Sequence, residues 1–111
     1  MKRDMELVQH ILLAVERGAE DINAIAAQHP TIDRDLVKDH TKQLWEAGFL
    51  RGTAQRKAQY FELMQPQLTL AAHDFLANAR NETVWAKAVE IIGERGGTVP
   101  MNVLAVLKHR Y

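Results

Sequence analysis

Hydrophobic residues recur every three or four positions along the first part of the chain, which is the period of a helix with one buried face. This pattern predicts a first helix over residues 4–17, stopped by Gly18, and a brief second helix that ends before His29–Pro30. A third helix is expected to begin after Asp33, whose carboxylate is a good N-cap, and to end at Ala47–Gly48. The inner stripe of this third helix comprises Leu36, Val37, His40 and Leu44.

After the third helix the pattern changes to the alternation of a β-hairpin. The expected strands are residues 49–53 and 59–64, and the polar, basic segment from Ala54 to Ala58 is the expected turn, exposed and mobile. Pro66 has no amide hydrogen to donate to a ladder. The second strand is therefore expected to end, bend or lie at an edge there.

Helical periodicity returns after the hairpin. Thr69 and Asn81 are expected to cap a fourth and a fifth helix, and Gly96–Gly97 ends the fifth. Thr98 and Pro100 then occupy the positions of an N-cap and a first-turn residue, which predicts a last short helix.

Three helices, a basic hairpin and further helices follow one another in the order of a winged helix-turn-helix. We therefore predict a mainly α fold with one β-hairpin, a winged helix-turn-helix with additional C-terminal helices. Residues 1–111 are expected to form a single domain, with a three-helix core at 1–47, a wing hairpin at 48–68 and C-terminal helices at 69–111.

The composition is that of an ordinary globular domain. The chain has 111 residues, of which 47% are hydrophobic, enough to build a core without a covalent staple. Cysteine is absent, and neither a signal peptide nor an apolar run long enough for a membrane span is evident. These features favour a cytoplasmic protein that does not engage a membrane.

Fourteen basic and fourteen acidic residues give a formal net charge of zero, so the positive field typical of nucleic-acid binders is missing for the chain as a whole. Acidic residues outnumber basic ones over residues 1–47, whereas residues 48–80 and the C-terminal stretch carry a local excess of bases. Any surface that faces a polyanion is expected to involve the hairpin or the C-terminus.

Several strings in this sequence match a known pattern. They are MKRDMELV at residues 1–8 followed by Ile11–Leu13, then His40, Leu44, Ala47–Gly48 and Leu50, then Leu68–Thr69, His73, Phe75–Leu76, Thr83–Trp85 and Lys87, and finally Gly96–Gly97 with Val103–Leu104. Together they resemble an uncharacterised domain-of-unknown-function family found in phages, prophages and bacteria. Ala72 departs from the family's usual glycine after Leu-Thr. The resemblance implies a winged-helix fold of phage-type origin and no particular biochemical role.

The first functional hypothesis is a DNA-binding regulator of transcription. It requires the third helix to enter a major groove and the hairpin to touch phosphate or the minor groove. The residues expected to contact DNA are Arg34, Lys38, Thr41, Lys42, Arg51, Arg56 and Lys57. Asp35 and Asp39 are expected on the same face of the third helix and would repel phosphate. The hairpin bases are therefore expected to make the main phosphate contacts.

The alternative hypothesis is a protein-interaction module, such as a phage accessory protein or an inhibitor of host machinery, that does not bind DNA. Zero net charge favours it, and Trp45 and Tyr60 are its candidate anchors unless they pack between helix and wing. A two-fold homodimer is also expected, because residues 81–111 place apolar side chains on more than one helical face. Trp85, Leu104 and Leu107 are the residues expected to take part in such contacts.

Catalysis, cofactors and metal binding are not expected. The chain has no glycine-rich phosphate loop, no nucleophile elbow and no serine. Its five histidines show no pair at the helical spacing that zinc sites commonly use. His40, on an apolar stripe, is expected to be a core histidine with one nitrogen satisfied.

Overall fold

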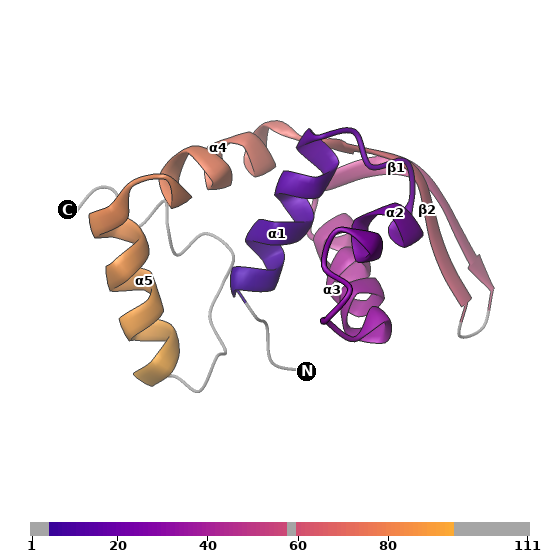
Figure 1. Ribbon diagram of the computed structural model, residues 1–111. Coiled ribbons are helices and arrows are strands. Elements are labelled where there is room, and N and C mark those ends of the chain that lie inside the picture. The colour runs from indigo at the N-terminus through magenta and orange to yellow at the C-terminus, as the bar shows by residue number, and fades with distance from the viewer. Residues whose placement is uncertain (1–4, 58–59, 95–111) are drawn as a thin grey trace.

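The computed structural model describes residues 5–57 and 60–94, and within them the chain is mainly helical with one antiparallel β-hairpin. The elements are α1 (Met5–Glu16), α2 (Ile22–Ala27), α3 (Arg34–Glu46), β1 (Leu50–Lys57), β2 (Tyr60–Leu68), α4 (Leu70–Ala79) and α5 (Glu82–Glu94). Figure 1 shows α1, α2 and α3 beside the hairpin, while α4 runs from the base of the hairpin towards α5 at the opposite side. The predicted mainly α class with one hairpin is confirmed. The predicted last helix lies outside the described residues.

Three helices begin where capping residues predicted them to begin. Asp33, Thr69 and Asn81 each accept a hydrogen bond from a backbone amide in the first turn of the following helix, at 2.8, 3.4 and 3.1 Å. Such bonds satisfy amides that have no partner inside the helix. Asp21 caps α2 in the same way at 2.8 Å, a cap that the sequence pattern did not single out.

The core is built around α1, which is buried on more than one side. The predicted stripe of Met5, Val8, Ile11, Leu12 and Val15 is buried, and so are Leu7 and Ala14. The additional burial arises because α1 contacts α2, α3 and β2 and is also covered by α4. The sequence predicted one apolar stripe on this helix, whereas the structure buries it on several sides.

Among the helices of the described residues, we found no segment with the length and hydropathy of a membrane span.

The hairpin is longer than predicted and contains a β-bulge near its base. Arg51 pairs with Gln67 and Thr53 pairs with Met64, so Gln65 and Pro66 together oppose the single residue Gly52. Gln65 has a positive φ of 54°, and its amide donates to the carbonyl of Glu20 at 2.8 Å. Pro66 lies in this bulge, where a residue without an amide hydrogen is tolerated.

The prediction that Ala54 to Ala58 form the turn is wrong for most of that segment. Ala54, Gln55 and Arg56 belong to β1, where they pair with Leu63, Glu62 and Phe61. The ladder extends this far because the alternating burial of β2 continues to its first residues, with Phe61 and Leu63 facing the core. Residues 58 and 59, which connect the two strands, lie outside the described part.

Candidate functional site

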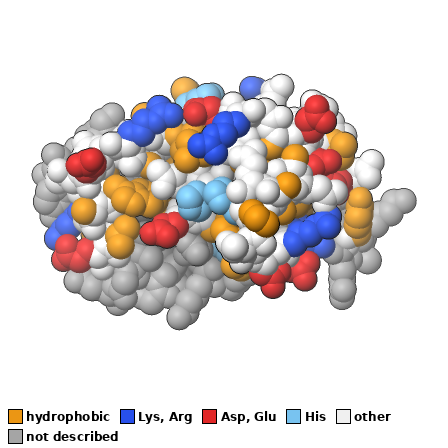
Figure 2. All heavy atoms as spheres, viewed as in Figure 1, with side chains coloured by type: hydrophobic (Ala, Val, Ile, Leu, Met, Phe, Trp, Pro, Cys, Tyr) orange, Lys and Arg blue, Asp and Glu red, His pale blue; other side chains and the backbone are white. Residues whose placement is uncertain are grey.

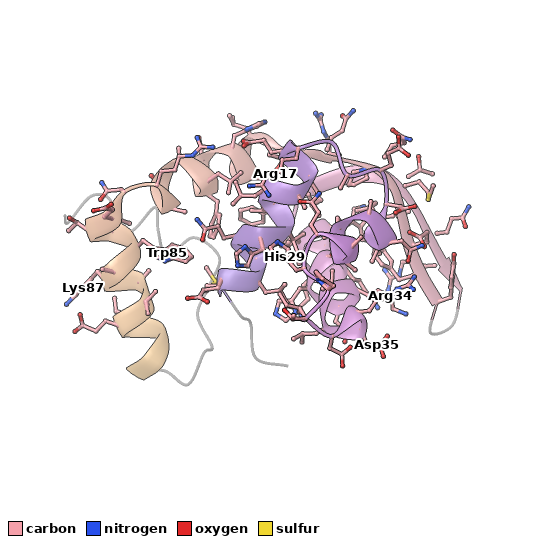
Figure 3. All side chains as sticks on the ribbon, in the orientation of Figure 1. Arg17, His29, Arg34, Asp35, Trp85 and Lys87 are labelled. Atoms are coloured by element: carbon pink, nitrogen blue, oxygen red, sulfur yellow. The ribbon has the colours of Figure 1, made fainter. Side chains whose placement is uncertain are left out.

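The exposed side of α3 divides into a basic row and an acidic row, because side chains four or seven residues apart lie on the same side of a helix. We call Arg34, Lys38 and Lys42 the basic row and Asp35, Asp39 and Glu46 the acidic row. Figure 3 labels Arg34 and Asp35, with which the two rows begin. Two rows of buried or half-buried residues flank them and decide which way each faces. Val37, Thr41 and Trp45 border the basic row, and Leu36, His40 and Leu44 lie beyond the acidic row.

The basic row therefore lies on the hairpin side of α3, since Trp45 contacts the hairpin. Lys38 and Lys42 are half-buried and Arg34 is exposed. Among the described residues, none of these three cations takes part in an ion pair. The sequence placed acids and bases of α3 on one common face, whereas the structure separates them into neighbouring rows.

Thr41 does not lie on this surface, so its prediction as a DNA contact is wrong. Its side chain is fully buried, and its hydroxyl donates to the carbonyl of Val37 at 2.7 Å. A threonine can satisfy its hydroxyl on the preceding turn, which allows it to face the core. His40 is buried as predicted, with Nδ1 placed to donate to the carbonyl of Leu36 at 2.9 Å.

Trp45 joins α3 to the hairpin. Its ring centroid lies 5.6 Å from that of Phe61 on β2, in a tilted arrangement typical of aromatic pairs. The guanidinium carbon of Arg56 on β1 lies 5.9 Å from the centroid of the Trp45 ring, at the limit for a cation–π contact. Trp45 is half-buried, so of the two possibilities left open for it the structure favours packing between helix and hairpin.

The hairpin cations do not share one face. The inner face of β1 carries Leu50, Ala54 and Arg56. They pair, in that order, with Leu68, Leu63 and Phe61, which lie on the core side of β2. Arg51 is offset by one residue from Leu50 and pairs with the exposed Gln67, which puts it on the outer face. Lys57 is the last residue of β1, and its side chain lies outside the described part.

The outer face of the hairpin carries the other predicted anchor. Tyr60 is 52% exposed and Met64 is 38% exposed, and both alternate with the buried Phe61 and Leu63. These two exposed side chains are separate from the basic row, because they lie on the face of the hairpin that points away from Trp45.

Two histidines that are distant in the sequence meet at the junction of α1 with the loop after α2. The ring centroids of His10 and His29 lie 4.4 Å apart with an interplanar angle of 40°. Arg17 reaches the same region and donates to the side-chain oxygen of Gln28 at 3.4 Å (Figure 3). Burial, the neighbouring His10 and the charge of Arg17 lower the pKa of His29 from its ordinary value of 6.5.

This lowered pKa predicts a pH-dependent stability. On acidification the unfolded chain binds the His29 proton before the folded chain does, so the contribution of His29 is present above pH 6.5 and is lost as the pH falls through the lower folded-state pKa. We expect His29→Gln to flatten the dependence of the free energy of unfolding on pH below pH 6.5, measured by urea denaturation. His73→Gln, which removes an exposed histidine outside this pair, is the control for a general effect of losing one imidazole. An identical slope in the parent and in His29→Gln would contradict the assignment.

A cavity of about 470 Å³ lies where the end of α1 meets the bulge of β2 and the start of α4. Its apolar lining includes Val15, Ala19 and Pro66, and Glu16 and Glu20 stand at its side. Glu16 is paired with Arg80 at 3.4 Å. In the described part of the chain, no group of three or more histidines and carboxylates is placed to hold a metal ion.

The predicted contact residues of the C-terminal helices are described only in part. Trp85 is half-buried on α5, and Val89 of the same helix is 46% exposed. Leu104 and Leu107 lie outside the described residues.

Comparisons with known proteins give a family without a stated activity. A family model described as "Hypothetical protein (DUF2513)" matches residues 2–98. A protein of Haemophilus influenzae described as uncharacterized is 31% identical over 86 residues, which cover 77% of this chain and 73% of that protein. No solved structure was found to match.

Proposed function

The chain belongs to the family described as hypothetical protein (DUF2513), and since that description names no activity, we propose from the geometry that the protein is a non-enzymatic winged-helix protein that binds duplex DNA. The order α1, α2, α3 and hairpin supports a winged helix-turn-helix, with α3 as the recognition helix. A regulatory role is part of this proposal, and so is the phage or prophage setting that the sequence resemblance implied.

The observation that carries the proposal is the basic row of α3 beside Arg56. Arg34, Lys38 and Lys42 line the hairpin side of the helix, and the guanidinium of Arg56 lies near Trp45 at the same junction. A 13-residue helix is about 20 Å long, and a major groove about 12 Å wide admits one. Cations along one edge of such a helix suit the phosphates at one wall of that groove, and the acidic row lies on the neighbouring edge of the helix.

The proposal is tested by binding of the purified protein to mixed-sequence duplex DNA at low salt, followed by fluorescence anisotropy. We expect binding that weakens linearly with the logarithm of the salt concentration. A second arm recovers partners from a bacterial lysate with and without nuclease. Absence of duplex binding at low salt, together with nuclease-resistant recovery of one defined protein, would contradict the proposal.

A protein-interaction module is the second candidate function. The observation that favours it is the exposed pair Tyr60 and Met64, together with a net charge of zero. Figure 2 shows acidic and basic side chains interspersed over the visible face, without the broad positive field of many DNA-binding domains. In this function the outer face of the hairpin, and not the basic row, would carry the contact.

We also propose that the protein forms a two-fold homodimer through its C-terminal helices. Val89 is 46% exposed on α5 and Trp85 is half-buried on the same helix, so α5 offers apolar surface to a partner. We expect sedimentation at tens of micromolar, a concentration chosen to detect weak dimers, to give a dimer. Val89→Asp should shift the protein to monomer, and a parent that sediments only as monomer would contradict the proposal.

A further inference from the structure

The strand register divides the hairpin cations between two faces, and only one of those faces meets α3. Arg56 pairs with Phe61 and belongs to the inner face, whereas Arg51 pairs with Gln67 and belongs to the outer face. The two residues are five positions apart on one strand, a separation of about 17 Å between their Cα atoms. One flat surface cannot contact both side chains and the basic row of α3 at once.

The side chain of Arg56 lies close to the ring of Trp45. The tryptophan is packed on Phe61 at 5.6 Å and is half-buried, so its ring is fixed by the core side of the hairpin. Arg56 is exposed at the surface, yet its guanidinium lies 5.9 Å from the Trp45 centroid. A long side chain on an exposed strand otherwise samples many rotamers. Binding a phosphate restricts it to one of them, and this loss of conformational entropy weakens the binding.

We propose that Trp45 is a positioning residue for Arg56, and that it extends the basic row of α3 into a single surface for one phosphodiester strand of a duplex. This inference rests on the proposed DNA-binding function. Lys42 precedes Trp45 by three residues, one turn along the helix, so Arg34, Lys38, Lys42 and Arg56 follow one another along one edge of the molecule. Arg51 lies outside this surface and does not contribute to binding.

A double-mutant cycle on a mixed-sequence DNA duplex tests the proposal. Arg56→Gln should lower the salt slope of binding by about one, as expected for one lost phosphate contact. Trp45→Leu, which keeps an apolar side chain but removes the ring, should weaken binding about two- to fivefold in the parent, the range that an exposed cation–π contact supplies. The same substitution should have no further effect in the Arg56→Gln background, because the cation it positions is absent.

Two matched variants separate positioning from folding and from general charge. Arg51→Gln removes a cation from the outer face of the same strand and should leave affinity and salt slope unchanged. Trp45→Phe retains more of the packing on Phe61 than leucine does, with a weaker cation–π partner, and should give a smaller loss than Trp45→Leu. Equal losses from Trp45→Leu with and without Arg56, or a loss from Arg51→Gln as large as that from Arg56→Gln, would overturn the proposal.

A measurement without DNA distinguishes failure of this inference from failure of the proposed function. The side-chain protons of Arg56 should be shifted upfield by the ring current of Trp45 in NMR spectra of the free protein, and Trp45→Leu should abolish the shift. If the parent shows this shift and binds no duplex, the arginine is positioned but the DNA-binding function is wrong. If Arg56 protons lie at their exposed values, the positioning role is overturned whether or not the protein binds DNA.

Discussion

Replacing Lys38 and Lys42 together by glutamine is expected to weaken binding to mixed-sequence duplex DNA and to lower the salt slope by about two, one unit for each lost phosphate contact. The two lysines lie one turn apart on the hairpin side of α3, and neither is engaged in an ion pair within the described residues. Their charges therefore add to the field at one edge of the helix. Fluorescence anisotropy over a series of salt concentrations measures both quantities.

The acidic row provides a control with the opposite sign. Asp35→Asn and Asp39→Asn together remove negative charge from the neighbouring row and leave the three cations of the basic row unchanged. The double variant should therefore bind duplex DNA more strongly. Equal affinity of the parent and the double lysine variant would contradict the assignment of the basic row. Equal weakening by the lysine and aspartate pairs would instead indicate that substitutions disturb α3 itself.

The elements themselves were predictable because their signals are local. Asp33, Thr69 and Asn81 cap helices as expected, since a cap needs only a short side chain and the amides of the next turn. The change from helical spacing to alternation located the hairpin for a similar reason. The family resemblance agrees with the family match, while the winged-helix description remains a proposal.

The site was less predictable because its contacts join distant parts of the chain. The sequence does not show that Thr41 faces inward, because a threonine next to lysines is typical of a polar helix face. The structure shows that its hydroxyl donates to the carbonyl of Val37, which allows the side chain to be buried. The contact between His10 and His29 depends on how α1 meets the loop after α2. Because side chains alternate between the two faces of a strand, the odd separation of Arg51 and Arg56 could have shown that they lie on opposite faces of β1. The predicted turn, which began at Ala54, placed Arg56 outside the strand, and this signal was therefore missed.

The bulge at the base of the hairpin illustrates how a single glycine fixes the register on which this surface depends. Leu50 and Leu68 pair below the bulge and Ala54 and Leu63 pair above it, and both pairs face the core. Leu50 and Ala54 are four residues apart on β1, whereas Leu68 and Leu63 are five apart on β2, so without the extra residue of β2 one of these two leucines would turn outward. The pairing of Arg56 with Phe61, the ring on which Trp45 packs, thus depends on the bulge opposite Gly52.

Gly52→Ala is expected to destabilise the protein by about 2–4 kcal/mol, more than other glycine substitutions at positive φ. A β-carbon at Gly52 would lie 2.8 Å from the carbonyl oxygen of Met64, a backbone atom that cannot turn aside, and the φ of 154° is itself unfavourable for alanine. Gly48→Ala is the matched control, because its φ is 83° but nothing lies within 4 Å of the added carbon. That control should cost only about 1–2 kcal/mol, the penalty of the left-handed backbone alone. Urea denaturation of the parent and both variants measures the difference, and equal free energies of unfolding for the two variants would show that the contact between Gly52 and Met64 does not determine the bulge.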